Sequence, residues 1–186
     1  MLHRLIPTWS VRLALLVGVL LIPLAQAQTP APMPPETASI RKVYESTQSR
    51  LSTLSRWRFQ AQRPDVSYPS QVTAWADGPT LRKLEVVDAD DSGDVVGEYF
   101  FDGGELVFFF GTIKSYNAQG RQATRSESRQ YFWGQRMGHW LLGLRDDRSV
   151  VAPQSAEFAQ EARLRASVAR FYATTALQNR PAQPKP

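Results

Sequence analysis

Two aromatic segments with nearly the same pattern occupy the middle of the chain. The first runs from Glu98 to Phe110 and the second, 31 residues later, from Arg129 to Leu141. In each, an aromatic run enters a glycine-containing turn and returns as another apolar run, which is the pattern of a β-hairpin. The first segment is apolar at successive as well as alternate positions, and strands of that kind are buried on both faces. Any fold for this chain must therefore cover both faces of a central sheet.

Further segments with a period of two flank these hairpins. The candidate strands are 58–62, 71–76, 80–87, 95–102, 105–113, 127–133 and 139–144. Turn-forming residues such as Asp77-Gly78-Pro79 and Asp102-Gly103-Gly104 separate them. The gaps are too short for parallel crossovers, which need a dozen or more residues. The sequence predicts an α+β domain with an antiparallel meander of about five to seven strands, which could be curled.

Two helices are predicted to pack on this sheet. The first, within residues 36–57, has an apolar arc of about 100°. Its members are Ile40, Val43, Tyr44, Thr47, Leu51 and Leu54. The second begins at Pro153, a favourable first helical residue, and runs to about Leu177. Its stripe of Leu164, Val168, Phe171 and Tyr172 is interrupted by Arg165, so we expect this helix to pack at an edge.

The first helix is predicted to cover one sheet face, and three arrangements remain open for the other face. The sheet could curl around a common core, because twisted sheets of many strands curl readily. The C-terminal helix could cross to the second face. Otherwise the face is an open aromatic groove for a lipid tail, a sugar or a protein, since large exposed apolar patches mark binding surfaces.

The termini differ in composition from this core. Residues 1–27 combine Arg4 and Arg12 with a 12-residue apolar run and the small-residue site Ala25-Gln26-Ala27, as in a secretory signal cleaved after Ala27. The run is shorter than the roughly 20 residues of a membrane-spanning helix. Residues 28–35 form a proline-rich tether, residues 36–178 a single domain, and residues 179–186 a tail. We therefore expect a periplasmic protein without a stable membrane anchor.

The composition excludes several kinds of functional site. The chain has no cysteine, which excludes disulfides, thiolate metal sites and thiol nucleophiles. Cleavage of the signal leaves 20 basic residues against 17 acidic ones, a net charge of +3. This surplus is too small to indicate nucleic-acid binding. No cofactor is expected.

The paired hairpins also resemble a known group of sequences. The segments Glu98-Tyr99-Phe100-Phe101-Asp102-Gly103-Gly104-Glu105-Leu106 and Arg129-Gln130-Tyr131-Phe132-Trp133-Gly134-Gln135-Arg136-Met137 resemble those of exported bacterial proteins that carry two E-x-Y-F-x-(D/N)-G-x-L hairpins behind an N-terminal helix. The resemblance covers roughly residues 40–144. The chain departs from it where Trp133-Gly134-Gln135 replaces the acidic turn and Gly138 replaces a branched residue. The group has no established activity, so the resemblance implies fold and export and transfers no catalytic residue.

One acidic segment has the start of a calcium-loop pattern. Asp88, Asp90 and Ser92 occupy alternate positions before Gly93, as at the first, third and fifth ligand positions. Tyr99 stands where the bidentate glutamate should be. An acidic turn between two strands explains these residues better, and no metal site is predicted.

The sequence gives little support to a catalytic site. His139 is the only histidine after residue 27, and Ser126, Ser128, Glu98 and Glu127 could be placed near it. No G-x-S-x-G elbow accompanies them. Glu98, Glu105 and Glu127 could supply a glycosidase pair, but cross-strand ion pairing, for example of Glu98 with Arg129, is the simpler interpretation.

Two basic segments and the central sheet remain as candidate surfaces. Arg56-Trp57-Arg58 and the series Arg121, Arg125, Arg129 could meet anionic lipid or cell-wall polymer, although a solvated rim of the sheet is the better explanation. The sequence favours a non-enzymatic periplasmic protein that binds an apolar small molecule or an envelope protein. The predicted contact residues are Phe100, Val107, Phe109 and Trp140. A small hydrolase using His139 and a structural envelope accessory protein are the alternatives.

Overall fold

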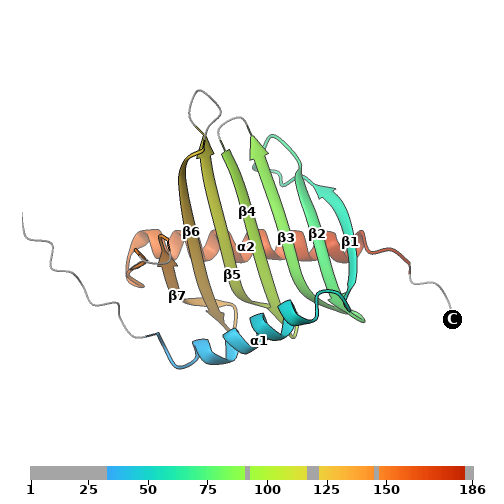
Figure 1. Cartoon of the computed structure of the whole chain (residues 1–186), viewed down its shortest axis with the longest axis horizontal. Helices are drawn as coiled ribbons and strands as arrows, with labels where there is room; N and C mark the ends of the chain where they lie inside the picture. The colour runs from blue at the N-terminus through green and yellow to red at the C-terminus, as the bar shows by residue number, and fades with distance from the viewer. Residues whose placement is uncertain (1–32, 91–92, 117–121, 145–146, 183–186) are drawn as a thin grey trace, which may run out of the picture.

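The structure is a computed structural model that describes residues 33–90, 93–116, 122–144 and 147–182. An eight-stranded antiparallel sheet follows the chain order from β1 to β8, with one helix before it and one after it (Figure 1). The elements are α1 (Thr37–Ser49), β1 (Ser55–Ala61), β2 (Ser70–Asp77), β3 (Thr80–Asp90), β4 (Gly93–Asp102), β5 (Glu105–Tyr116), β6 (Gln122–Trp133), β7 (Arg136–Leu142), β8 (Ser149–Val150) and α2 (Ala156–Gln178). The predicted α+β class and the antiparallel meander are confirmed, with more strands than the five to seven expected. The eighth strand has two residues, too few to show an alternating pattern.

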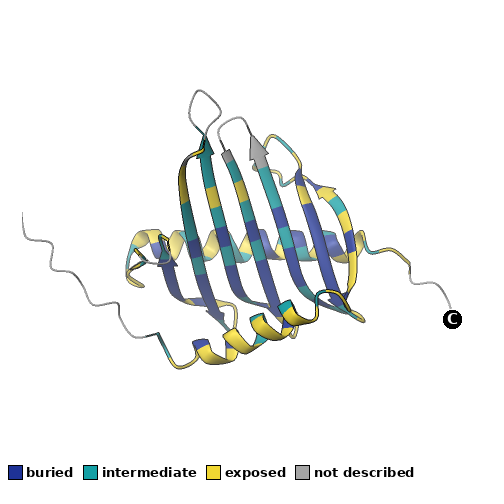
Figure 2. Cartoon of the chain, in the orientation of Figure 1, coloured by how far each residue is buried: buried dark blue, intermediate teal, exposed yellow. Residues whose placement is uncertain are grey.

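The two helices lie on opposite faces of an open sheet. In Figure 1, α2 crosses behind the strands and α1 lies in front of their lower ends. Ile40 of α1 packs with Phe100 and Phe108, whereas Tyr172 of α2 packs in a larger core with Leu84. Of the three predicted arrangements for the second face, the crossing of the C-terminal helix is therefore the one observed. The strands become more exposed toward the upper ends of β3 to β6, beyond the helices (Figure 2).

The helix boundaries differ from those predicted. α1 ends at Ser49, and Leu51 and Leu54 follow in a turn. Trp57, expected at the end of this helix, lies in β1, where its Nε1 donates to the carbonyl oxygen of Ala176 at 3.1 Å. The N-cap residue of α2 is Ser155, whose Oγ accepts from the backbone N–H of Phe158, a standard way to satisfy a helix start.

The buried stripe of α2 also differs from the predicted one. Leu164 is 43% exposed, while the smaller Ala169 and Ala176 are buried together with Val168 and Tyr172. Small residues let the helix backbone approach the sheet closely. α2 therefore lies across the sheet as a main core element and not at its edge.

β-bulges set the direction of the aromatic side chains. The register of β4 and β5 shifts at Phe100/Phe101, so that Phe101 pairs with Leu106 and Phe100 with Phe108. Val107 is the extra residue. Such an insertion changes which face the following side chains occupy. Phe100 and Phe108 consequently lie in the α1-side core and Phe109 in the α2-side core.

The second hairpin has an equivalent bulge. Tyr131 pairs with His139 and Phe132 with Met137, which leaves Gly138 unpaired. A Cβ atom at Gly138 would lie 1.8 Å from the Trp133 ring. Glycine at this position is thus required by the tryptophan that folds across it, which accounts for the departure from a branched residue.

Candidate ligand-binding groove

The four predicted contact residues do not form one surface. Phe100 is fully buried on the α1 side, with 0% exposure, whereas Phe109 and Trp140 are 2% and 6% exposed on the α2 side. Val107 is half-buried and packs on the α1 side. The bulge in β5 separates Phe109 from Phe100 and Val107. The accessible aromatic surface of this sheet is therefore formed by residues other than these four.

A row of side chains crosses the sheet on the α1 side. Successive strand partners place Arg56, Trp75, Lys83, Phe100, Phe108, Tyr131 and His139 side by side from β1 to β7. The Lys83 Nζ atom lies 5.2 Å from the ring centres of both Trp75 and Phe100. The rings of Phe108 and Tyr131 are 5.0 Å apart. Cation–π and aromatic pairs of this kind stabilise neighbouring strands.

An open cavity lies where α1 meets this row. We call it the α1 groove. It has a volume of about 410 Å³ and is lined by Met33, Ile40, Arg41, Tyr44, Glu45, Phe108, Phe110, Arg129, Tyr131, Leu141 and Arg148. Phe108, Phe110, Tyr131 and Leu141 come from the sheet, and Ile40 and Tyr44 from α1. The volume falls in the range of about 300–1,000 Å³ that is usual for small-molecule sites.

Three arginines stand around this apolar lining. Arg129 Nη2 forms an ion pair with Glu127 at 2.8 Å, and its guanidinium lies 4.9 Å from the centre of the Phe110 ring. Burial raises the pKa of Tyr131, while the positive charges of Arg129, Arg41 and Arg148 act to lower it. All three arginines are thus close enough to influence one phenol at the groove.

His139 lies beside the groove and away from the candidate nucleophile Ser128. It is 5% exposed, and its ring centre is 5.9 Å from that of Tyr131. Ser128 lies on the α2 side of the sheet, where its Oγ accepts a hydrogen bond from Trp140 Nε1 at 2.9 Å. The histidine and this serine therefore do not meet, and no Ser–His pair is assembled from them.

Burial of His139 predicts a loss of stability in mild acid. Burial lowers the pKa of His139 because the charged imidazolium is disfavoured away from water. The unfolded chain therefore takes up this proton first as the pH falls below about 6.5. The contribution is present above that pH and is lost as the pH falls toward the lower pKa of the folded protein. We expect urea denaturation at pH 7 and pH 5.5 to show a smaller decrease in stability for His139→Gln than for the parent protein; equal decreases would contradict this role.

The candidate glutamates are held in separate polar contacts. The Lys83 Nζ atom lies 2.5 Å from Glu98, Arg125 and Arg129 both pair with Glu127, and Gln135 donates to Glu105 at 3.1 Å. Ion pairing is confirmed for Glu98 and Glu127, but the predicted pair of Glu98 with Arg129 is wrong. Phe110 stands between these two residues in the strand register.

The acidic segment forms the end of the β3–β4 hairpin. Asp88 pairs with Val95 and Asp90 with Gly93, while Ser92 lies outside the described residues. The Asp94 carboxylate accepts from the hydroxyl of Tyr116 at 2.5 Å. Among the described residues, no group of three or more histidine and acidic side chains is arranged to hold a metal ion.

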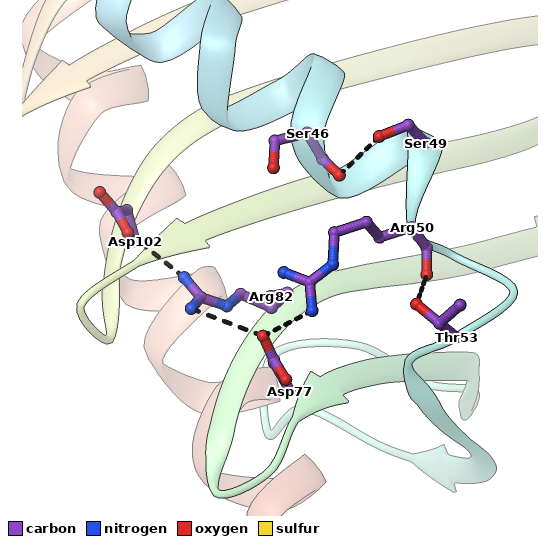
Figure 3. Close-up of polar contacts among 7 residues, drawn as sticks. All are labelled: Ser46, Ser49, Arg50, Thr53, Asp77, Arg82 and Asp102. Carbon is purple, nitrogen blue, oxygen red and sulfur yellow. Dashed lines mark hydrogen bonds and ion pairs between the residues drawn. The ribbon is translucent and has the colours of Figure 1, made fainter.

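A second polar cluster fixes the C-terminal end of α1. Arg82 bridges Asp77 and Asp102, and Arg50 also pairs with Asp77 at 2.9 Å (Figure 3). Close by, the Ser49 hydroxyl donates to the carbonyl oxygen of Ser46 within α1, and the Thr53 hydroxyl donates to that of Arg50 just after it. These partly exposed ion pairs contribute about 0–1 kcal/mol each. They connect the end of α1 to the turns of the sheet, whereas Ile40 and Arg41 near its start line the groove.

The basic segments are divided between different environments. Arg56 lies over the Trp75 ring, with 5.9 Å from its guanidinium carbon to the ring centre, and Trp57 is buried on the α2 side. Arg129 lines the groove, Arg125 is 48% exposed and pairs with Glu127, and Arg121 lies outside the described residues. No helix in the described part of the chain is both long and apolar enough to cross a membrane.

Comparison with protein-family models, curated proteins and solved structures finds no match to this chain. The resemblance to exported proteins with paired hairpins therefore stays a prediction.

Proposed function

We propose that this chain is an exported, non-enzymatic periplasmic protein that binds an apolar small molecule in the α1 groove. The observation that carries the proposal is the groove itself: an open cavity of about 410 Å³ in which aromatic and aliphatic side chains from α1, β5, β6 and β7 stand beside four charged side chains. Predominantly apolar cavities with a few polar groups are the usual form of small-molecule sites. The basic and apolar N-terminal segment with its Ala25-Gln26-Ala27 site supports export.

The geometry favours a bound molecule over catalysis. The charged side chains that line the groove are Arg41, Glu45, Arg129 and Arg148. The candidate catalytic residues Ser128 and His139 are not among the lining residues, and they lie on opposite sides of the sheet. A general base must reach the group that it activates. The apolar lining instead offers burial to a ligand, and each buried methylene contributes about 0.8 kcal/mol to binding.

Phe110→Ala is expected to weaken binding of a neutral alkyl probe. Phe110 is half-buried and lines the groove, so its loss removes apolar contact worth about 1.5 kcal/mol or more, roughly tenfold in affinity. Decanol is titrated by calorimetry into protein recovered from the periplasm and checked to begin at Gln28. Phe59→Ala is the matched control, because Phe59 is also half-buried but packs on the α2 side.

Equal decanol affinities for the two variants would place the probe outside the groove. A parent protein that binds no alkyl probe would contradict the binding function. Recovery of the chain only in unprocessed form would contradict export.

A further inference from the structure

The rim of the α1 groove contains buried cationic donors without partners. Nη1 of Arg129 and Nε of Arg148 are both buried, and neither has a hydrogen-bond partner within the described residues. Buried donors are nearly always satisfied by protein, water or ligand. We infer that the ligand of the groove is an amphiphile whose carboxylate is held by Arg129 and Arg148 while its alkyl chain lies on the aromatic lining; this inference rests on the proposed binding function.

Arg129 is prepared for such a contact by its surroundings. On one side its Nη2 is fixed by Glu127 at 2.8 Å, and the Phe110 ring lies 4.9 Å from the guanidinium carbon. These contacts limit the rotation of a side chain that is otherwise flexible. The unpartnered Nη1 atom belongs to this restrained guanidinium, which lowers the entropic cost of a contact with a ligand.

Arg148 approaches the same groove from another part of the chain. It lies directly before β8, and Val150, two residues later, pairs with the groove residue Leu141. Arg41 of α1 completes the rim. The charges of all three arginines act on the phenol of Tyr131, so their positive potentials overlap in one region of the groove.

The number of charges and donors fits a carboxylate. Arg41, Arg129 and Arg148 stand against Glu45 in the lining, and Glu127 beside it is shared by Arg129 and Arg125, which leaves a surplus of positive charge that suits an anion. Two unpartnered nitrogen atoms, one on each of two guanidiniums, match the two oxygens of one carboxylate, and charge-assisted bonds of this type are strong. A phosphomonoester brings a larger negative charge, and a quaternary ammonium would meet repulsion.

The inference is tested with alkyl probes of equal chain length. Decanoate, decanol, decyl phosphate and decyltrimethylammonium are titrated by calorimetry into the full mature protein below their micelle-forming concentrations. We expect decanoate to bind about tenfold more tightly than decanol, equivalent to about 1.4 kcal/mol, and decyltrimethylammonium to bind least.

Arginine variants locate the head group. Arg129→Gln and Arg148→Gln are each expected to abolish most of the tenfold preference for decanoate over decanol. Arg125→Gln is the matched control, because Arg125 lies on the same strand and pairs with the same Glu127 but is not among the groove-lining residues. It should retain the preference. Thermal unfolding of each variant verifies that the fold is intact.

The outcomes separate this inference from the proposed function. If decanol and decanoate bind the parent equally, the apolar groove stands and the carboxylate site is overturned. Tighter binding of decyl phosphate than of decanoate would overturn the choice of head group. A preference for decanoate that persists in both arginine variants would overturn the assignment to this rim. Failure of every probe would overturn the proposed function as well.

Discussion

Phe109→Ala is expected to lower the free energy of unfolding by about 4 kcal/mol, within the range of about 3–5 for removing a buried phenylalanine. The Phe109 ring lies against Gly97 and Gly111, where added Cβ atoms would come within 3.0 and 2.8 Å of it. Its other neighbours include Tyr99, 4.9 Å away between ring centres, and the Arg165 guanidinium at 3.8 Å. A cavity at this position could not be filled by small movements, because strands and helix surround it.

Equilibrium denaturation in urea measures this loss of unfolding free energy. Two comparisons test whether the loss comes from the buried position of Phe109. Phe110→Ala, the same substitution one residue later, should cost less because Phe110 is half-buried at the groove. Conversely, Phe109→Ala should leave decanol affinity intact at temperatures where the variant is folded. A loss below about 1 kcal/mol, typical of ordinary substitutions, would contradict the central position of this ring.

The broad architecture was predictable because local signals agree with it. Turns such as Asp77-Gly78 and Asp102-Gly103 separate the strands in the structure as in the sequence pattern, and short turns require antiparallel neighbours. The apolar arc of α1 was also predicted correctly in its first half, where Ile40 and Tyr44 pack against the aromatic row. The periodic signal continued past Ser49 only because Leu54, buried from a turn, happens to follow the helical spacing.

The membership of the candidate site was not predictable from alternation. Strict alternation assigns successive β5 residues to opposite faces, whereas the bulge places both Val107 and Phe108 on the α1 side. A one-residue shift exchanges the faces of a strand. Arg148 was missed for a different reason: it lies outside every predicted element, and only the short pairing of β8 with β7 brings it to the groove.

Arg165 is the residue whose predicted and observed roles differ most. The sequence pattern treats it as an interruption of an apolar stripe. In the structure its guanidinium lies over Phe109, donates to the Tyr99 hydroxyl at 3.1 Å and pairs with Glu161 at 2.5 Å. Glu161 in turn accepts from Gln130 at 2.8 Å. The arginine thus connects α2 to the sheet through a largely buried polar network.

Arg165→Ala is therefore expected to cost about 3 kcal/mol of unfolding free energy, the lower end of the range for breaking a buried ion pair. The lower end applies because both side chains retain 18% exposure. The substitution leaves the Glu161 carboxylate largely desolvated with only a neutral donor. Arg163→Ala, at an exposed position on the same helix, is the control and should change stability by no more than about 0.5 kcal/mol.

A second substitution distinguishes loss of the ion pair from loss of packing. Arg165→Leu combined with Glu161→Gln replaces the pair by an apolar side chain and a neutral amide that still can accept from Gln130. Because the main cost of the single change is an unpaired buried charge, the double variant is expected to recover about 1–2 kcal/mol relative to Arg165→Ala. If the double variant recovers no stability, the stacking of the guanidinium on Phe109 is what stabilises the fold. If Arg165→Ala unfolds no more easily than Arg163→Ala, the polar network contributes nothing to stability and α2 is held by its apolar stripe alone.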